Sequence, residues 1–145
     1  VLAYIESEKG SFKKAALEIA SYGSAIAKQT NTSLTAVVFN ADDCSLLGKY
    51  GVDKVIIVQT IQGFNAEIYA DILKQAVEKE KSKIVLLSNS ADSKYIAPLL
   101  SMASMLVMYQ TLYHSQSVQA LFKSKEVSLL TRLLQKRKFL QKLKL

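Results

Sequence analysis

Few residues of this sequence have the type and spacing that catalysis or metal binding requires. His114 is the single histidine and Cys44 the single cysteine, so a Ser-His-acid relay or a Cys/His metal set has almost nothing to draw on. We interpret His114 as an incidental surface histidine. Cys44 follows Asp42 and Asp43, whose charges should raise the pKa of its thiol and oppose a redox role. The sequence therefore predicts no catalytic residue and no metal site.

The most suggestive polar segment is Ser88-Asn89-Ser90, which lies between an apolar run and a helical pattern. Its hydroxyls and backbone N–H groups are able to bind a phosphate at the start of the following helix. We favour the plainer interpretation, a strand-to-helix turn with capping residues. The charged run Glu78–Lys81 is most simply a solvated helix end. Because the sequence has no Gly-x-Gly-x-x-Gly, Walker A or nucleophile-elbow motif, we assign no cofactor-binding residue.

The elements that must position these residues alternate between short apolar strands and helices. Strands are expected at Val1–Ser7, Leu34–Phe39, Lys54–Gln59 and Lys83–Ser88. Helices are expected from a Ser11 cap to Gln29, from Asp42 or Asp43 to Leu47, from an Asn65 cap to Lys81, and from Asp92 or Ser93 past Leu100. The third helix should bury a stripe of apolar residues: Ile68, Ile72, Leu73, Ala76 and Val77.

This order predicts the fold class α/β, with an open parallel sheet of four or five strands and helices on both faces, a three-layer sandwich. Ligands of such sheets bind at the carboxyl ends of the strands. The corresponding loops here are Ser7–Gly10, Asn40–Asp43 and Ser88–Asp92.

Composition is that of an ordinary globular domain of 145 residues. A lone cysteine suits a reducing compartment. No apolar stretch reaches the roughly 18 residues that cross a bilayer, and residues 1–10 do not resemble a secretory signal. From these features we expect a soluble, cytoplasmic protein.

The net charge of +7 is concentrated at one end. Basic and acidic residues balance through Tyr109, whereas the segment from Gln110 onward has eight Lys or Arg and a single acid, Glu126. A basic surface spread over the whole domain is therefore not indicated, and the excess belongs to the tail.

Residues 1–40, 46–59 and 64–104, in this order and spacing, resemble the N-terminal domain of the electron-transfer flavoprotein α subunit, most closely in versions from Bacteroidetes-like bacteria. The best markers are Lys49–Val55 (KYGVDKV) and Ala97-Pro98-Leu99. Many family members have Gly-Arg-Asp before that Ala-Pro. This sequence has the segment 92–95 (DSKY) there, so no role of the family arginine is transferred.

The resemblance implies an α/β domain that docks on a β subunit, in a heterodimer that carries electrons from acyl-CoA dehydrogenases of fatty acid β-oxidation and related dehydrogenases. The resemblance thus implies a subunit of an electron carrier and not an enzyme. The family binds FAD mainly through a second domain of the α subunit, whose Gly-rich and Ser-rich segments have no counterpart here. We therefore carry over no FAD-contacting residue and expect that this chain does not retain FAD by itself.

The resemblance stops at about residue 104. One permitted codon choice for Met105–Tyr113, ATG CTG GTT ATG TAT CAA ACG TTG TAC, read from its third base, gives A-G-Y-V-S-N-V-V, the strand that the family has there. Ser128–Phe139, displaced in the same way, yields F-T-N-K-A-F-A-K-T-E-I, a later family segment. We therefore divide the chain into an N-terminal domain, 1–104, and an anomalous basic tail, 105–145, which we expect to be helical. We interpret the tail as a frameshifted translation that truncates the family domain.

Other interpretations of the tail stay open. Apolar residues at 127, 130, 133, 134 and 140 share one stripe of a possible helix, which would dock on the domain or bind RNA or an anionic membrane. The domain itself is alternatively a free-standing nucleotide-binding module. Losing the family's fifth strand should also leave the sheet with an uncovered edge, and with it marginal solubility.

Overall fold

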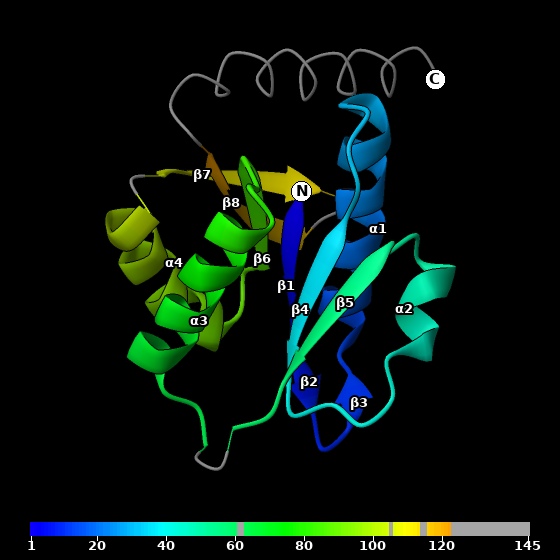
Figure 1. Cartoon of the computed structure of the whole chain (residues 1–145), viewed down its shortest axis with the longest axis horizontal. Helices are drawn as coiled ribbons and strands as arrows, with labels where there is room; N and C mark the ends of the chain where they lie inside the picture. Colours follow the sequence, from blue (N-terminus) through cyan, green and yellow to red (C-terminus); the bar gives the residue numbers. More distant parts are fainter. Residues whose placement is uncertain (61–62, 105, 114–115, 123–145) are drawn as a thin grey trace.

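A computed structural model of the chain describes residues 1–60, 63–104, 106–113 and 116–122 (Figure 1). Its strands are β1 (Leu2–Ile5), β2 (Ser7–Glu8), β3 (Ser11–Phe12), β4 (Thr35–Phe39), β5 (Lys54–Val58), β6 (Ile84–Ser88), β7 (Val107–Tyr113) and β8 (Gln116–Phe122). Its helices are α1 (Lys14–Gln29), α2 (Ser45–Lys49), α3 (Ala66–Lys79) and α4 (Ala91–Ser104).

Within the described residues the main sheet has the strand order β5-β4-β1-β6-β8-β7. Strands β5, β4, β1 and β6 run parallel, as the α/β prediction requires. Strand β8 pairs antiparallel with β6, and β7 pairs antiparallel with β8. The short strands β2 and β3 form a separate hairpin directly after β1.

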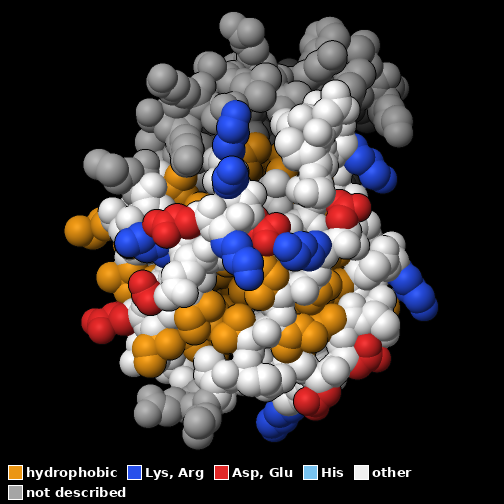
Figure 2. All heavy atoms as spheres, viewed as in Figure 1, with side chains coloured by type: hydrophobic (Ala, Val, Ile, Leu, Met, Phe, Trp, Pro, Cys, Tyr) orange, Lys and Arg blue, Asp and Glu red, His pale blue; other side chains and the backbone are white. Residues whose placement is uncertain are grey.

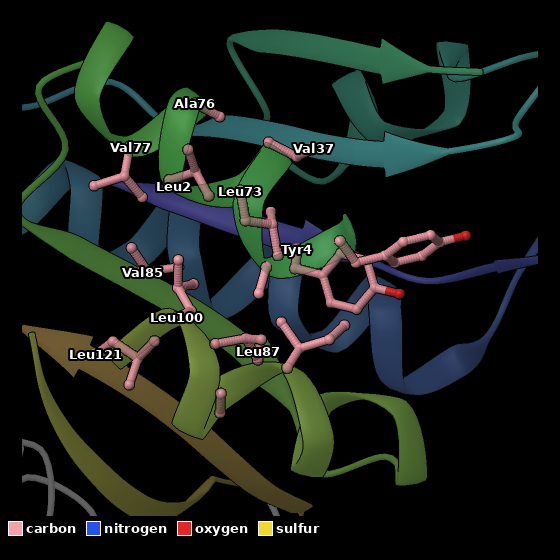
Figure 3. Close-up of a cluster of buried hydrophobic side chains, with 14 of the residues drawn as sticks. Leu2, Tyr4, Val37, Leu73, Ala76, Val77, Val85, Leu87, Leu100 and Leu121 are labelled. Atoms are coloured by element: carbon pink, nitrogen blue, oxygen red, sulfur yellow. The ribbon is translucent and has the colours of Figure 1, made fainter. Parts of the chain in front are cut away.

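Helices cover both faces of the parallel strands (Figure 1). Side chains of β1 alternate between the two faces: Ala3 and Ile5 pack with α1 in a first core cluster, whereas Leu2 and Tyr4 pack with α3 and α4 in a second core cluster (Figure 3). Burial on both faces explains why these strands read as nearly unbroken apolar runs. The predicted three-layer α/β sandwich is confirmed.

Three of the four predicted helix starts are wrong, and one is right. Helix α2 begins at Ser45 after an N-cap at Cys44, and not at a cap formed by Asp42 or Asp43. Ser11 does not cap α1; it pairs with Glu8 in the β2–β3 hairpin, so the helix begins only at Lys14. Helix α4 begins at Ala91, before the predicted starts at 92 and 93. Asn65 caps α3 as predicted, its side-chain oxygen accepting hydrogen bonds from the backbone N–H groups of residues 67 and 68 at 3.0 and 3.1 Å.

The buried face of α3 is rotated relative to the prediction. Leu73, Ala76 and Val77 are buried as expected, but Ile68 is 42% exposed. Tyr69 takes its place, because it is the residue that reaches the aromatic side chains at the end of the sheet.

Residues 107–113 and 116–122 differ from the helical tail that we expected. They form the strands β7 and β8, and β8 fills the sheet edge that was predicted to stay uncovered. The physical reason is the free edge of β6, whose backbone N–H and C=O groups are satisfied by a neighbouring strand and not by a helix. Leu121 of β8 is completely buried. His114 and residues 123–145 lie outside the described residues.

The marker segment 49–55 has a structural role in the turn before β5. Gly51 adopts φ +82°, a conformation that favours glycine, and a β-carbon there would clash with the Ser24 side chain. The Asp53 carboxylate accepts a hydrogen bond from the Leu34 backbone N–H at 2.8 Å. The segment therefore joins the starts of β4 and β5 to helix α1.

Candidate functional site

The order of the parallel strands reverses beside β1. The chain proceeds from β1 through β4 to β5 on one side and then crosses to β6 on the other side of β1. The loops that follow β1 and β6 therefore diverge at the carboxyl end of the sheet, which is where sheets of this type bind ligands. The predicted ligand-binding loops, Ser7–Gly10, Asn40–Asp43 and Ser88–Asp92, follow β1, β4 and β6 at this carboxyl end of the sheet.

A buried carboxylate occupies the point of divergence. Glu6, directly after β1, is only 6% exposed. Its Oε1 accepts hydrogen bonds from the hydroxyls of Ser88 at 2.7 Å and Ser93 at 3.0 Å, and from the hydroxyl of Ser90. These three serines come from the end of β6, the following loop and the first turn of α4. Burial of the carboxylate is tolerated because its oxygen is hydrogen-bonded.

The Ser88–Ser90 segment thus has the structural role that we favoured. Ser90 also accepts a hydrogen bond from the Ser93 backbone N–H at 3.1 Å, which caps α4. Its hydroxyl and that of Ser88 donate to Glu6 and not outward. A phosphate placed here would meet a buried carboxylate, so this arrangement disfavours the nucleotide-binding alternative.

Further negative charge lies close to Glu6. Burial and then Glu6 raise the pKa of Asp92, with Glu8 adding to the rise and Lys13 opposing it. Burial, followed by Glu6 and Asp92, also raises the pKa of the Tyr4 phenol. Both shifts have the same two causes, burial first and then acidic neighbours, which at this edge of the sheet outweigh the basic ones.

An aromatic wall stands beside these carboxylates. The rings of Phe39 and Tyr69 stack with centroids 3.8 Å apart, and Tyr4 meets Phe39 edge to face at 5.8 Å. Phe64 packs edge to face on Tyr69 at 5.1 Å and is 42% exposed. The wall is formed by β1, β4, α3 and, at Phe64, the loop before α3. The labelled Tyr4 in Figure 3 marks where the wall borders the second core cluster.

The carboxylates and the aromatic wall border one open cleft of about 510 Å³. Polar links hold its loops. Ser7 Oγ donates to the Phe39 carbonyl at 2.6 Å, and Asn40 exchanges two hydrogen bonds with Thr60, of 2.7 and 2.8 Å. Beyond them, Gly10 and Lys9 form the hairpin turn with positive φ. The size lies within the range of small-molecule sites.

The other candidates from the sequence do not join this site. Cys44 is half-buried at the start of α2 and packs against the first core cluster. Burial, and then Asp43, raise the pKa of its thiol, the direction that the sequence predicted. Among the described residues no group of three His, Cys, Asp or Glu is placed to hold a metal ion. That the chain has no catalytic, cofactor-binding or metal residue stays a prediction.

The described part of the chain also has no helix with both the length and the apolar character needed to cross a bilayer. Sequence patterns alone do not directly indicate the Glu6 cluster. Its one signal was an acid ending the apolar run of β1, with serines at three spaced positions after β6.

The reversed strand order, with a cleft at the carboxyl edge, defines a doubly wound α/β protein. Residues 1–108 match the electron transfer flavoprotein domain, and the chain belongs to this family. No curated protein matches the chain.

Membership implies a flavoprotein, so the described residues must be tested for a fit to FAD. The pyrophosphate of a dinucleotide normally lies at the first turn of a helix beside the strand-order reversal. Here that place has Glu6, Asp92 and a helix start already capped by Ser90. This edge of the sheet does not fit FAD, and we derive no chemical step through the flavin.

Proposed function

We propose that residues 1–104 are the N-terminal domain of an electron-transfer flavoprotein α subunit, whose task is to dock on the β subunit. The intact heterodimer would then carry electrons from acyl-CoA and related dehydrogenases in the cytoplasm. The observation that carries the proposal is the family match over residues 1–108, which spans β1 to α4. The marker segments 49–55 and 97–99, which resemble those of the α subunit, support the proposed subunit type.

A docking role is supported by the outer face of α4. Tyr95, Leu99 and Met102 are spaced as neighbours on one side of the helix and are 67%, 37% and 82% exposed. Figure 2 shows hydrophobic side chains reaching the surface on this side of the molecule. Apolar side chains grouped in this way are what an interface with another subunit covers.

Co-expression with the β subunit of the same genome tests the proposal, with complex formation measured by size-exclusion chromatography and titration. Met102→Lys should weaken the complex at least about tenfold, because it places a charge in an apolar contact. Gln75→Lys, at an exposed position on α3, is the matched control and should leave affinity unchanged. Failure of the wild-type chain to bind the β subunit would refute the docking role.

The division at residue 104 belongs to the same proposal. Residues from about 105 onward are read from a shifted frame, and the family match ends at 108, within the region where the two codon readings diverge. The gene sequence is the direct test, since codons of 105–113 and 128–139 that do not encode the family segments in the shifted phase would refute it.

A further inference from the structure

The docking proposal leaves the cleft at the carboxyl edge of the sheet without a ligand. Its lining brings together two features from distant parts of the chain: the carboxylates near the β1–β6 divergence and the aromatic wall of β1, β4 and α3. Each feature limits the chemistry of what binds.

The charges of the cleft do not cancel. Glu8 and Lys13, both largely exposed, pair with each other at 3.3 Å. This leaves the carboxylates of Glu6 and Asp92 against the exposed Lys9 in the hairpin turn. Glu6 already accepts three hydroxyl donors on one oxygen, whereas Asp92 is only partly buried and borders the open space. Asp92 is therefore the carboxylate with which a positively charged ligand can pair.

The aromatic wall restricts the shape of that cation. Phe64 is the ring with accessible surface, and it is held against Tyr69 next to Gly63, which also lines the cleft. Aromatic faces attract delocalised, weakly hydrated cations. A divalent metal ion would instead require several oxygen ligands, and the described residues offer no group of three acidic, His or Cys side chains for one.

We infer that the cleft binds a planar organic cation of the amidinium or guanidinium type, with its charge on Asp92 and its flat face against Phe64. A guanidinium or amidinium group satisfies both features, since it hydrogen-bonds a carboxylate through two parallel N–H groups and stacks on aromatic rings. The cation has two possible sources, a free small molecule or an arginine side chain of another protein.

Titration of the full chain, labelled with ¹⁵N, with benzamidine tests the inference. Backbone signals of Gly10, Gly63 and Phe64 should shift and saturate at concentrations up to about 10 mM, the affinity range of small fragments. Benzamide, a neutral molecule of the same shape, should produce no saturating shift. Benzoate, an anion of similar shape, should produce none either.

Two variants and one control localise the binding. Asp92→Asn should weaken benzamidine binding at least about tenfold, as expected for loss of a charged hydrogen-bond partner. Phe64→Ala, at a partly exposed position, should weaken benzamidine binding severalfold, because it removes the aromatic ring and leaves the Asp92 carboxylate in place. Asp71→Asn on the outside of α3, where Asp71 accepts a hydrogen bond from Gln75, should leave benzamidine binding unchanged.

Three results would overturn the inference: no saturating shift with benzamidine, equal shifts with benzamide, or unchanged affinity in Asp92→Asn. A second titration, with Nα-acetylarginine amide, distinguishes the two possible sources of the cation. If it shifts the same signals, the cleft is a receptor for an arginine side chain; if only benzamidine does, the ligand is a free aromatic cation. These measurements do not depend on the β subunit, so they can fail or succeed independently of the docking proposal.

Discussion

Strand β6 has two different neighbours, and the contrast between them separates two regions of the molecule. On one edge it pairs parallel with β1, and Leu86 lies in register with Ala3. On the other edge it pairs antiparallel with β8, and the same Leu86 lies in register with Ala120. The first pairing lies within the family match and the second lies beyond it.

The two pairings make different demands on the sequence. A parallel neighbour requires a crossover helix and burial on both faces, and these are supplied by the alternating strands and helices of residues 1–104. An antiparallel neighbour needs only a free edge and a short segment with strand-forming residues. The β1–β6 side should therefore be essential to folding, whereas the β7–β8 hairpin should add stability without determining the fold.

The largest effect is expected on the β1–β6 side. Leu86 is fully buried in the first core cluster, close to Gly23 of α1. Leu86→Ala should lower the free energy of unfolding by about 2–5 kcal/mol, the cost of a cavity in a packed core. Urea denaturation followed by circular dichroism measures this loss. Leu99→Ala on the exposed face of α4 is the matched control and should cost much less.

A smaller effect is expected on the β8 side. Leu121 is also fully buried in the second core cluster, but it lies on β8, which pairs antiparallel with β6 outside the four parallel strands. Leu121→Ala should cost about 2 kcal/mol, at the low end of the range for such truncations. The melt should stay cooperative. If Leu121→Ala abolished cooperative unfolding while Leu86→Ala did not, the contrast between the two edges would be wrong.

A substitution in the turn before β5 examines the other edge of the sheet, where β5 is the last parallel strand. Gly51→Ala forces a side chain into a positive-φ conformation and against Ser24, and should cost about 1–3 kcal/mol. The measurement is the same urea denaturation. Gly48→Ala provides the control, because a β-carbon at Gly48 meets no atom within 4 Å. Equal costs at the two glycines would contradict a structural role for the marker segment.

Much of the parallel half was predictable because its signals are local. Apolar runs between helical patterns identified β1, β4, β5 and β6, and the Asn65 cap sits next to the helix that it starts. The Ser11 cap failed although the turn at Glu8–Gly10 was recognised, because pairing Ser11 with Glu8 takes that segment into a hairpin before the helix begins.

The remaining features depend on contacts between distant residues. Strand β8 forms because β6 offers a free edge, which no pattern within residues 107–122 reveals. The Glu6 cluster joins residue 6 to serines more than eighty positions later. The rotation of α3 that buries Tyr69 instead of Ile68 likewise depends on a contact with Phe39 in strand β4. Local periodicity predicts elements, whereas such contacts require the three-dimensional fold.

The smallest expected effect concerns Asp92, at the start of the helix that follows β6. Burial and the nearby Glu6 raise its pKa above the ordinary value of 3.8. The native carboxyl therefore keeps its proton at pH values where the unfolded one has lost it, so this group's contribution to stability falls as pH rises from about 3.8 to the raised pKa. Asparagine cannot titrate and does not suffer this loss.

Asp92→Asn should consequently be close to wild type in stability at about pH 3 and more stable than wild type at about pH 7, with the difference appearing between these values. Urea midpoints across this pH range measure it, and Asp71→Asn, outside the cleft, is the control. The opposite sign at neutral pH would mean that attraction between the Asp92 carboxylate and the N-terminus of α4 outweighs its repulsion from Glu6. In that case the carboxyl edge of the sheet would not hold the uncompensated negative charge that distinguishes it from the β7–β8 side.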